Sequence, residues 1–206
     1  MLKDLDHALA EISAIRSQIA RSVVFRGYGP ATLAATGLLA FVAAGAQAAF
    51  LAQPARHVSA YLALWAGTAL LCAGLVGVEM VTRTRRVHGG LAQEMLWTAV
   101  EQFVPAAAAG GFLTFVLLAS APEVAWMLPG LWQVNFSLGV FASCRFLPPA
   151  IFWVGGWYLT AGLASLALAR GDLALSPLVM GAGFGVGQLL TAIILHFHRE
   201  EGEGDA

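Results

Sequence analysis

Six apolar runs dominate this chain and constrain its fold. They cover about 30–52, 58–81, 97–120, 124–144, 148–169 and 175–197. Each is close to the ~20 residues that a helix needs to cross the hydrocarbon core of a bilayer. The chain is 59% hydrophobic and 11% charged, whereas a soluble domain has about 25% charged residues. We therefore expect an all-α, polytopic membrane protein with six transmembrane helices over residues 28–198.

The breaks between the runs carry residues that end helices. Proline follows Gln53 and Ala121, glycine occupies 89–90 and 171, and two prolines stand together at 148–149. The fourth run also contains Pro129-Gly130, which predicts a helix that is kinked or starts late.

Two segments flank the predicted bundle. Residues 1–27 are predicted to form an amphipathic helix, because apolar residues recur at a three-four spacing: Leu2, Leu5, Leu9, Ile12, Ile19 and Val23. Such a helix lies at the membrane surface. Alternatively, it forms a short coiled coil or docks a cytosolic protein through residues 2–24. Residues 199–206 are acidic and are expected to form a disordered cytoplasmic tail.

The distribution of positive charge predicts the orientation. Cytoplasmic loops of membrane proteins carry an excess of Lys and Arg. Of the 11 Lys and Arg residues, only Arg56 and Arg170 fall in the loops on the side opposite the N-terminus. We therefore expect a multi-pass protein of the inner (cell) membrane with both termini in the cytoplasm.

A short pattern occurs three times, at 26–31, 101–106 and 145–150. Each copy has a charged residue, then three residues including an aromatic one, then Pro-Ala. Proline is common in the first turn of a helix, where its missing N–H needs no partner. The pattern predicts the starts of the odd-numbered helices and so three tandem hairpins. Chance combined with interface composition is the alternative explanation.

If the repeat is real, its charged residues lie at similar depth near the cytoplasmic surface. Arg26, Glu101 and Arg145, with Glu79 on the same side, then form an inner-rim charge cluster. Partly buried charges need partners of opposite sign. The cluster is predicted to clamp the hairpins together, and a gate that handles anions or protons is the alternative.

A few polar side chains fall at mid-membrane depth, next to aromatic ones. The candidate cavity residues are Asn135, Gln188, Gln133, Trp132, Trp153 and Trp157. A cavity with aromatic walls and a few amides suits a small, mostly apolar ligand. Amides of neighbouring helices also hydrogen-bond to each other, typically for ~1 kcal/mol, and this is the commoner role.

No pattern of catalytic residues stands out, so an enzyme is the less favoured class, and we predict no cofactor. His196 and His198 point to different sides of a helix and make a poor metal pair. His196 with Glu79 or Glu101 is only a weak candidate metal site. The net charge of −1 gives no field that would attract nucleic acid.

The sixth run is rich in glycine, at Gly181, Gly183, Gly185 and Gly187. A phosphate-binding loop requires a strand-turn-helix setting, whereas overlapping GxxxG spacing in an apolar run is typical of close helix packing. We expect glycine-rich faces to pack helices within the bundle, or to join copies into a homo-oligomer or a complex with another subunit.

This outline resembles the substrate-binding subunits of energy-coupling vitamin importers in size and in its small-residue first helix, although it shares no diagnostic motif with them. The main hypothesis is a small-solute binding or transport protein, or one subunit of a carrier. One alternative is a membrane-anchored sensor or assembly protein that recruits a cytosolic partner. The other is a lipid-modifying enzyme at Glu79, Glu101 and His196.

Overall fold

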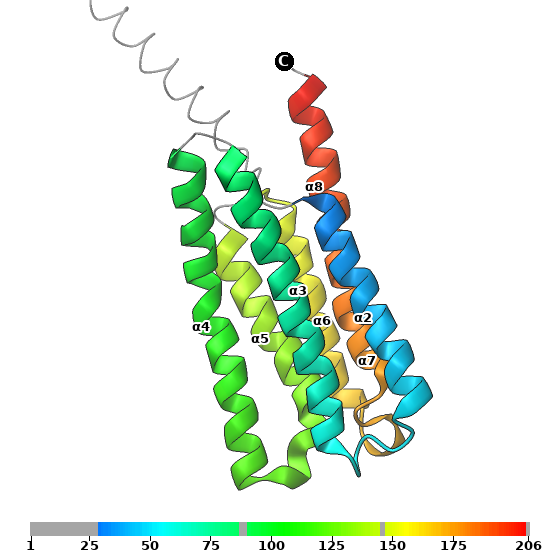
Figure 1. The fold of residues 1–206 in the computed structure, drawn as a ribbon. Coiled ribbons are helices and arrows are strands. Elements are labelled where there is room, and N and C mark those ends of the chain that lie inside the picture. Colours follow the sequence, from blue (N-terminus) through cyan, green and yellow to red (C-terminus); the bar gives the residue numbers. More distant parts are fainter. Residues whose placement is uncertain (1–28, 87–89, 145–146, 205–206) are drawn as a thin grey trace, which may run out of the picture.

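The computed structural model describes residues 29–86, 90–144 and 147–204, without the side chains at 83–86, 90–99, 172 and 199–204. The predicted N-terminal helix over residues 1–27 lies outside the described residues. Helices make up the described chain, joined by short turns (Figure 1). They are α2 (Pro30–Phe50), α3 (Val58–Arg86), α4 (Gly90–Ser120), η1 (Pro122–Met127), α5 (Leu128–Ser143), α6 (Ile151–Leu168), η3 (Gly171–Leu173), α7 (Pro177–Met180), η4 (Gly181–Val186) and α8 (Gly187–Gly204).

Length and hydropathy make this a multi-pass membrane protein, as predicted. Among the described residues, five helical stretches are long and apolar enough to cross a bilayer: Pro30–Phe50, Val58–Thr82, Val100–Ser120, Ile151–Leu168 and Pro177–His198. The helix that corresponds to the fourth apolar run, α5, is shorter. It has 16 residues, which span only about 24 Å of a core about 30 Å thick. The 3₁₀ turn η1 directly precedes it. The prediction that the fourth helix starts late is therefore confirmed, with Pro129 in its first turn.

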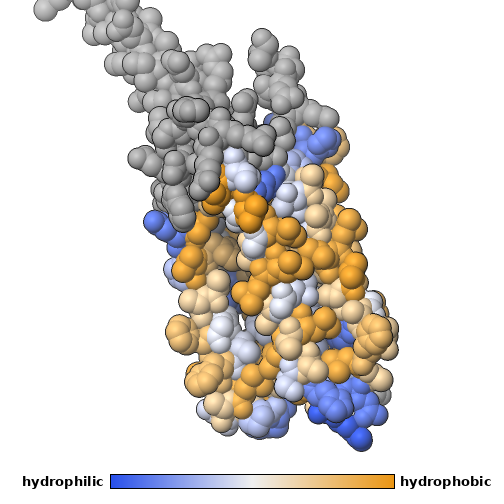
Figure 2. Space-filling model, in the orientation of Figure 1, coloured by the Kyte–Doolittle hydropathy of each residue, from blue (hydrophilic) through white to orange (hydrophobic). Residues whose placement is uncertain are grey.

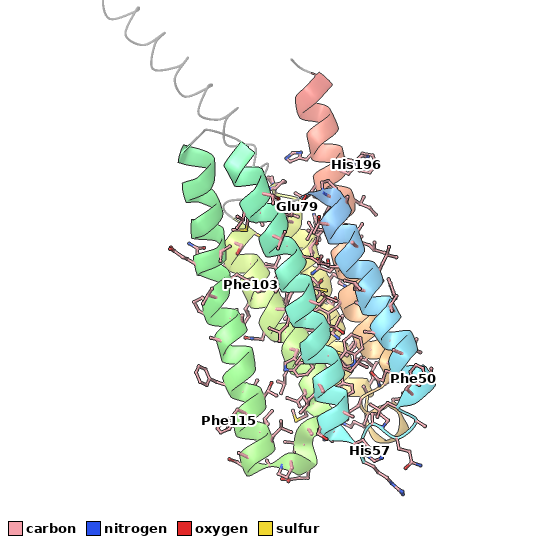
Figure 3. The ribbon with its side chains drawn as sticks, in the orientation of Figure 1. Phe50, His57, Glu79, Phe103, Phe115 and His196 are labelled. Carbon is pink, nitrogen blue, oxygen red and sulfur yellow. The ribbon has the colours of Figure 1, made fainter. Side chains whose placement is uncertain are left out.

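The surface along the middle of the bundle is mostly apolar, and hydrophilic side chains gather at its lower end in Figure 2. On α4, exposed Val104, Phe112, Phe115 and Val116 face outward, and Figure 3 shows Phe115 pointing away from the bundle. Exposed apolar side chains of this size are unfavourable in water and favourable in hydrocarbon. These faces are therefore apolar enough to lie against lipid.

The helices run side by side, and some that pack together are far apart in the chain, such as α2 and α8. The closest packing is between α5 and α6, followed by α4 with α5 and α2 with α8. Loops 51–57, 121–127 and 169–176 lie together at the end opposite the C-terminus (Figure 1). We call this the distal end, and the end where α2 begins and α8 finishes the proximal end.

Two sequence predictions need correction. The pattern at Glu101–Ala106 does not open a helix, because α4 begins at Gly90 and contains Pro105 in its interior. A proline inside a helix removes the hydrogen bond to the carbonyl four residues earlier, and membrane helices tolerate this. One residue after Pro105, Asn135 of α5 donates to the Ala106 carbonyl and joins α5 to α4. At the other terminus, α8 continues to Gly204, into the segment 199–206 for which we expected disorder.

Candidate functional site

The last span is one continuous helix, but its regular α-helical bonding is interrupted in its glycine-rich part. Ser176 caps α7 by accepting a hydrogen bond from the Leu178 amide at 3.3 Å. After α7 the chain widens into the π-helical turn η4 and then continues as α8. A turn closed by i→i+5 bonds is rare and is often found at functional sites. This interruption is the first element of the candidate site.

Side chains from the neighbouring helices donate to backbone carbonyls around the interruption. Trp157 Nε1 donates to the Gly183 carbonyl at 2.9 Å, and Gln133 Nε2 donates to the Val179 carbonyl at 3.0 Å. The Tyr158 hydroxyl reaches the Phe184 carbonyl at 3.5 Å. The Gly183 and Phe184 carbonyls also accept from the Gly187 amide within the helix. The side-chain bonds therefore join α5 and α6 to this part of the last span.

Glycines of η4 and the first residue of α8 permit this close approach. A Cβ at Gly183 would lie 2.5 Å from Gln133 Nε2, and one at Gly187 would lie 2.3 Å from the Tyr158 ring. On α2, a Cβ at Gly37 would lie 3.0 Å from the Gly185 carbonyl oxygen. The described glycine-rich face thus packs inside the bundle, which is one of the two roles predicted for it.

A buried hydrogen-bonded layer lies toward the distal end. Gln47 of α2 is 1% exposed. Its Nε2 donates to the Leu175 carbonyl at 2.6 Å, and its Oε1 accepts from Trp65 Nε1 of α3 at 2.7 Å. Leu175 has a φ of +57°, a left-handed conformation that costs a leucine roughly 1–2 kcal/mol. The Gln47 bond and burial of the Leu175 side chain hold this residue in place.

Two polar atoms in this region are buried without a hydrogen-bond partner among the described residues: the Tyr61 hydroxyl and Gln133 Oε1. Both side chains are 0% exposed. The Tyr61 ring stacks on Trp132 with centroids 6.4 Å apart and belongs to the same buried cluster as Leu175 and Met180. Buried polar atoms are normally paired, so two unpaired ones call for an explanation.

The six predicted cavity residues are placed as follows. Gln133 and Trp157 bond to carbonyls of the last span, Asn135 bonds to Ala106, and Trp132 Nε1 donates to Thr114 of α4 at 2.8 Å. Gln188 accepts from Thr36 of α2 at 3.3 Å. Trp153 is 75% exposed and so faces lipid. Five of the six therefore connect one helix to another, the commoner of the two predicted roles.

The predicted inner-rim cluster is only partly described. Arg26 and Arg145 lie outside the described residues. Glu79 of α3 is partly buried, and its Oε2 accepts from the Gly29 amide at 3.1 Å, whereas Glu101 of α4 is exposed. Glu79 and His196 lie at the proximal end, opposite His57 (Figure 3). Among the described residues, no group of three His, Cys, Asp or Glu side chains has the arrangement to hold a metal ion.

A hollow of about 420 Å³ opens at the distal end. It is formed by all three distal loops and the adjoining helix ends, and its lining residues are Ala55, Val58, Pro122, Glu123, Ala125, Trp126, Arg170, Gly171, Ala174 and Leu175. The Arg170 guanidinium lies 5.2 Å from the centroid of the Trp126 ring. Leu175 separates this hollow from the buried layer, since it lines the hollow and accepts the Gln47 bond.

Sequence reasoning missed Gln47, Tyr61 and Leu175. A signal existed for Gln47, which is the lone amide inside the first apolar run and meets the same criterion as Gln133 and Gln188. Tyr61 and Leu175 gave no signal, because an aromatic or aliphatic residue in an apolar run is ordinary. Comparison with known proteins adds no further residue: the chain matches no protein-family model, no curated protein and no solved structure.

Proposed function

We propose that this protein binds a small, mostly apolar solute within the membrane, as a binding or transport protein or as one subunit of a carrier. The observation that carries the proposal is the pair of unpartnered buried atoms, the Tyr61 hydroxyl and Gln133 Oε1. Leaving a buried polar atom unpaired costs roughly 1–3 kcal/mol. A solute that offers an acceptor to Tyr61 and a donor to Gln133 would remove that penalty.

The surroundings of the Tyr61 hydroxyl favour an apolar solute body. The cluster around Tyr61 includes Leu175 and Met180, with Trp132 and Phe184 packed against it. Pockets for small molecules combine apolar and aromatic walls with a few polar groups that fix orientation. The solute we propose therefore has one donor and one acceptor on a hydrocarbon or aromatic frame.

The interrupted last span supports movement of the solute into and out of the site. Gln133 contacts this span at Val179 and lies against Gly183. π-helical turns inside α-helices are frequently found at functional sites. Both polar atoms are enclosed in the described conformation, so access requires η4 and its neighbours to shift. The excess of Lys and Arg on the side of the N-terminus favours one orientation in the cell membrane. In that orientation both termini face the cytoplasm and the distal end faces outward.

Solute retention tests the proposal. Wild type, Tyr61→Phe and Gln133→Leu are purified in nanodiscs of native lipid, and bound molecules are extracted and identified by mass spectrometry. We expect a compound with a donor and an acceptor to co-purify with wild type. Its amount should fall about tenfold in each variant, since one hydrogen bond is worth about that factor in affinity.

Thr160→Val is the matched control, because Thr160 is exposed and its hydroxyl donates to the Gly156 and Trp157 carbonyls of its own helix. This variant should retain the wild-type amount of solute. Equal retention in all four proteins, or no bound compound in wild type, would contradict the proposal.

A further inference from the structure

The distal hollow carries opposite charges that face one space. Glu123 comes from η1 and Arg170 from the loop after α6. Both side chains are exposed and both line the hollow. Among the described side chains, these two form no ion pair with each other, although a carboxylate and a guanidinium within 4 Å would attract strongly. A molecule seated in the hollow would therefore have an exposed carboxylate and an exposed guanidinium side chain in its wall.

Arg170 is held in position for such a molecule. Its guanidinium lies over the Trp126 ring at 5.2 Å, a cation–π arrangement that restricts a long side chain. The guanidinium carries five N–H donors in its plane, and no described side chain is seen to accept from them. They remain able to hold a carboxylate or phosphate in the fork geometry that arginine favours.

The rest of the hollow is apolar and sized for a small molecule. Val58, Ala125, Ala174 and Leu175 line it beside Trp126, and about 420 Å³ lies within the range of about 300–1,000 Å³ that is usual for ligand pockets. A ligand that matches this hollow has a cation for Glu123, an anion for Arg170 and a hydrocarbon portion for the lining.

We propose that the distal hollow, between Glu123 and Arg170, is a binding site for a zwitterion that carries an ammonium group, an anionic group and an apolar portion. Two sources present this chemistry. One is the headgroup of phosphatidylethanolamine from the adjoining leaflet, and the other is a free amino acid with an apolar side chain. The site is independent of the buried one, because it uses neither Tyr61 nor Gln133.

Binding measurements on the full chain in phosphatidylglycerol nanodiscs separate the two sources. Phosphatidylethanolamine is titrated in the bilayer and read out by native mass spectrometry, and leucine is titrated in solution by calorimetry. Binding of either zwitterion supports the site and identifies its source. For leucine, the single-charge analogues 3-methylbutylamine and 4-methylpentanoate should bind about tenfold more weakly, as expected when one charged contact is lost.

Substitutions locate the site. Glu123→Gln and Arg170→Gln should each weaken binding of the zwitterion about tenfold. Arg56→Gln should leave it unchanged, because Arg56 is an exposed distal arginine that does not line the hollow. All three positions are exposed, so the melting temperature should stay near that of wild type. The proposal is overturned if neither zwitterion binds, or if Glu123→Gln and Arg170→Gln affect binding no more than Arg56→Gln does.

Discussion

Replacing Gln47 with leucine should destabilise the protein by about 2–4 kcal/mol, because two buried groups lose their partner at once. The Gln47 amide joins three elements, since it donates to the Leu175 carbonyl and accepts from Trp65. Leucine has nearly the same size but no polar atom. The Trp65 N–H and the Leu175 carbonyl would then remain unpaired in an apolar layer, and Leu175 would lose one of the contacts that hold its left-handed backbone.

Equilibrium unfolding of the purified protein in mixed micelles measures this effect, and Gln133→Leu is the matched control. Gln133 is also a fully buried amide, but it makes one described hydrogen bond and leaves its Oε1 unpaired. Removing an unpaired acceptor offsets the loss of one bond, so Gln133→Leu should cost about 1 kcal/mol or less in solute-free protein. If the two variants are equally destabilised, the hydrogen-bond assignment of Gln47 is incorrect.

The second large effect is expected where α5 and α6 cross. A Cβ added at Gly162 of α6 would lie 2.8 Å from the Gly130 carbonyl oxygen and 2.8 Å from the Val134 nitrogen of α5. Both are backbone atoms, so no side-chain rotation relieves the overlap. Gly162→Ala should therefore separate the two helices and destabilise the protein by about 1–3 kcal/mol.

Gly156→Ala on the same helix is the control for that substitution. A Cβ at Gly156 would meet no atom within 4 Å. Alanine favours the helical backbone over glycine by up to about 1 kcal/mol, so this variant should be as stable as wild type or slightly more stable. The same unfolding measurement decides between the two outcomes. A Gly162→Ala variant that is as stable as Gly156→Ala would show that α5 and α6 do not approach this closely.

Hydropathy predicted five helices that are long and apolar enough to cross a bilayer, because a bilayer demands a minimum length and an apolar chemistry of a span. The predicted fourth span corresponds to the shorter helix α5. Hydropathy predicted helix ends less well. Pro105 resembles a helix start in sequence, yet α4 begins at Gly90. A proline is compatible with the first turn of a helix and, in a membrane, with its interior, so the proline alone does not reveal where the helix begins.

The candidate site was less predictable than the fold. The sequence identified Gln133, Trp132 and Trp157 as polar or aromatic residues at mid-depth, but it could not say what each one bonds. The glycine spacing predicted close packing. It did not predict the π-helical turn, nor the hydrogen bonds that carbonyls in or beside this turn accept from Gln133, Trp157 and Tyr158 of other helices. Such partners are a property of the assembled bundle.

The π-helical turn also bears on how the chain tolerates changes of length. A turn closed by i→i+5 bonds contains one residue more than a turn closed by i→i+4 bonds. Deleting one residue within Gly181–Val186 can therefore convert η4 to regular α-helix without rotating α8. Ala192 and Leu195 would keep their places in the core. The same deletion in the middle of α6, a regular helix, would turn everything after it by about 100°. The interruption thus gives the last span a point where sequence length can change while the buried face is preserved.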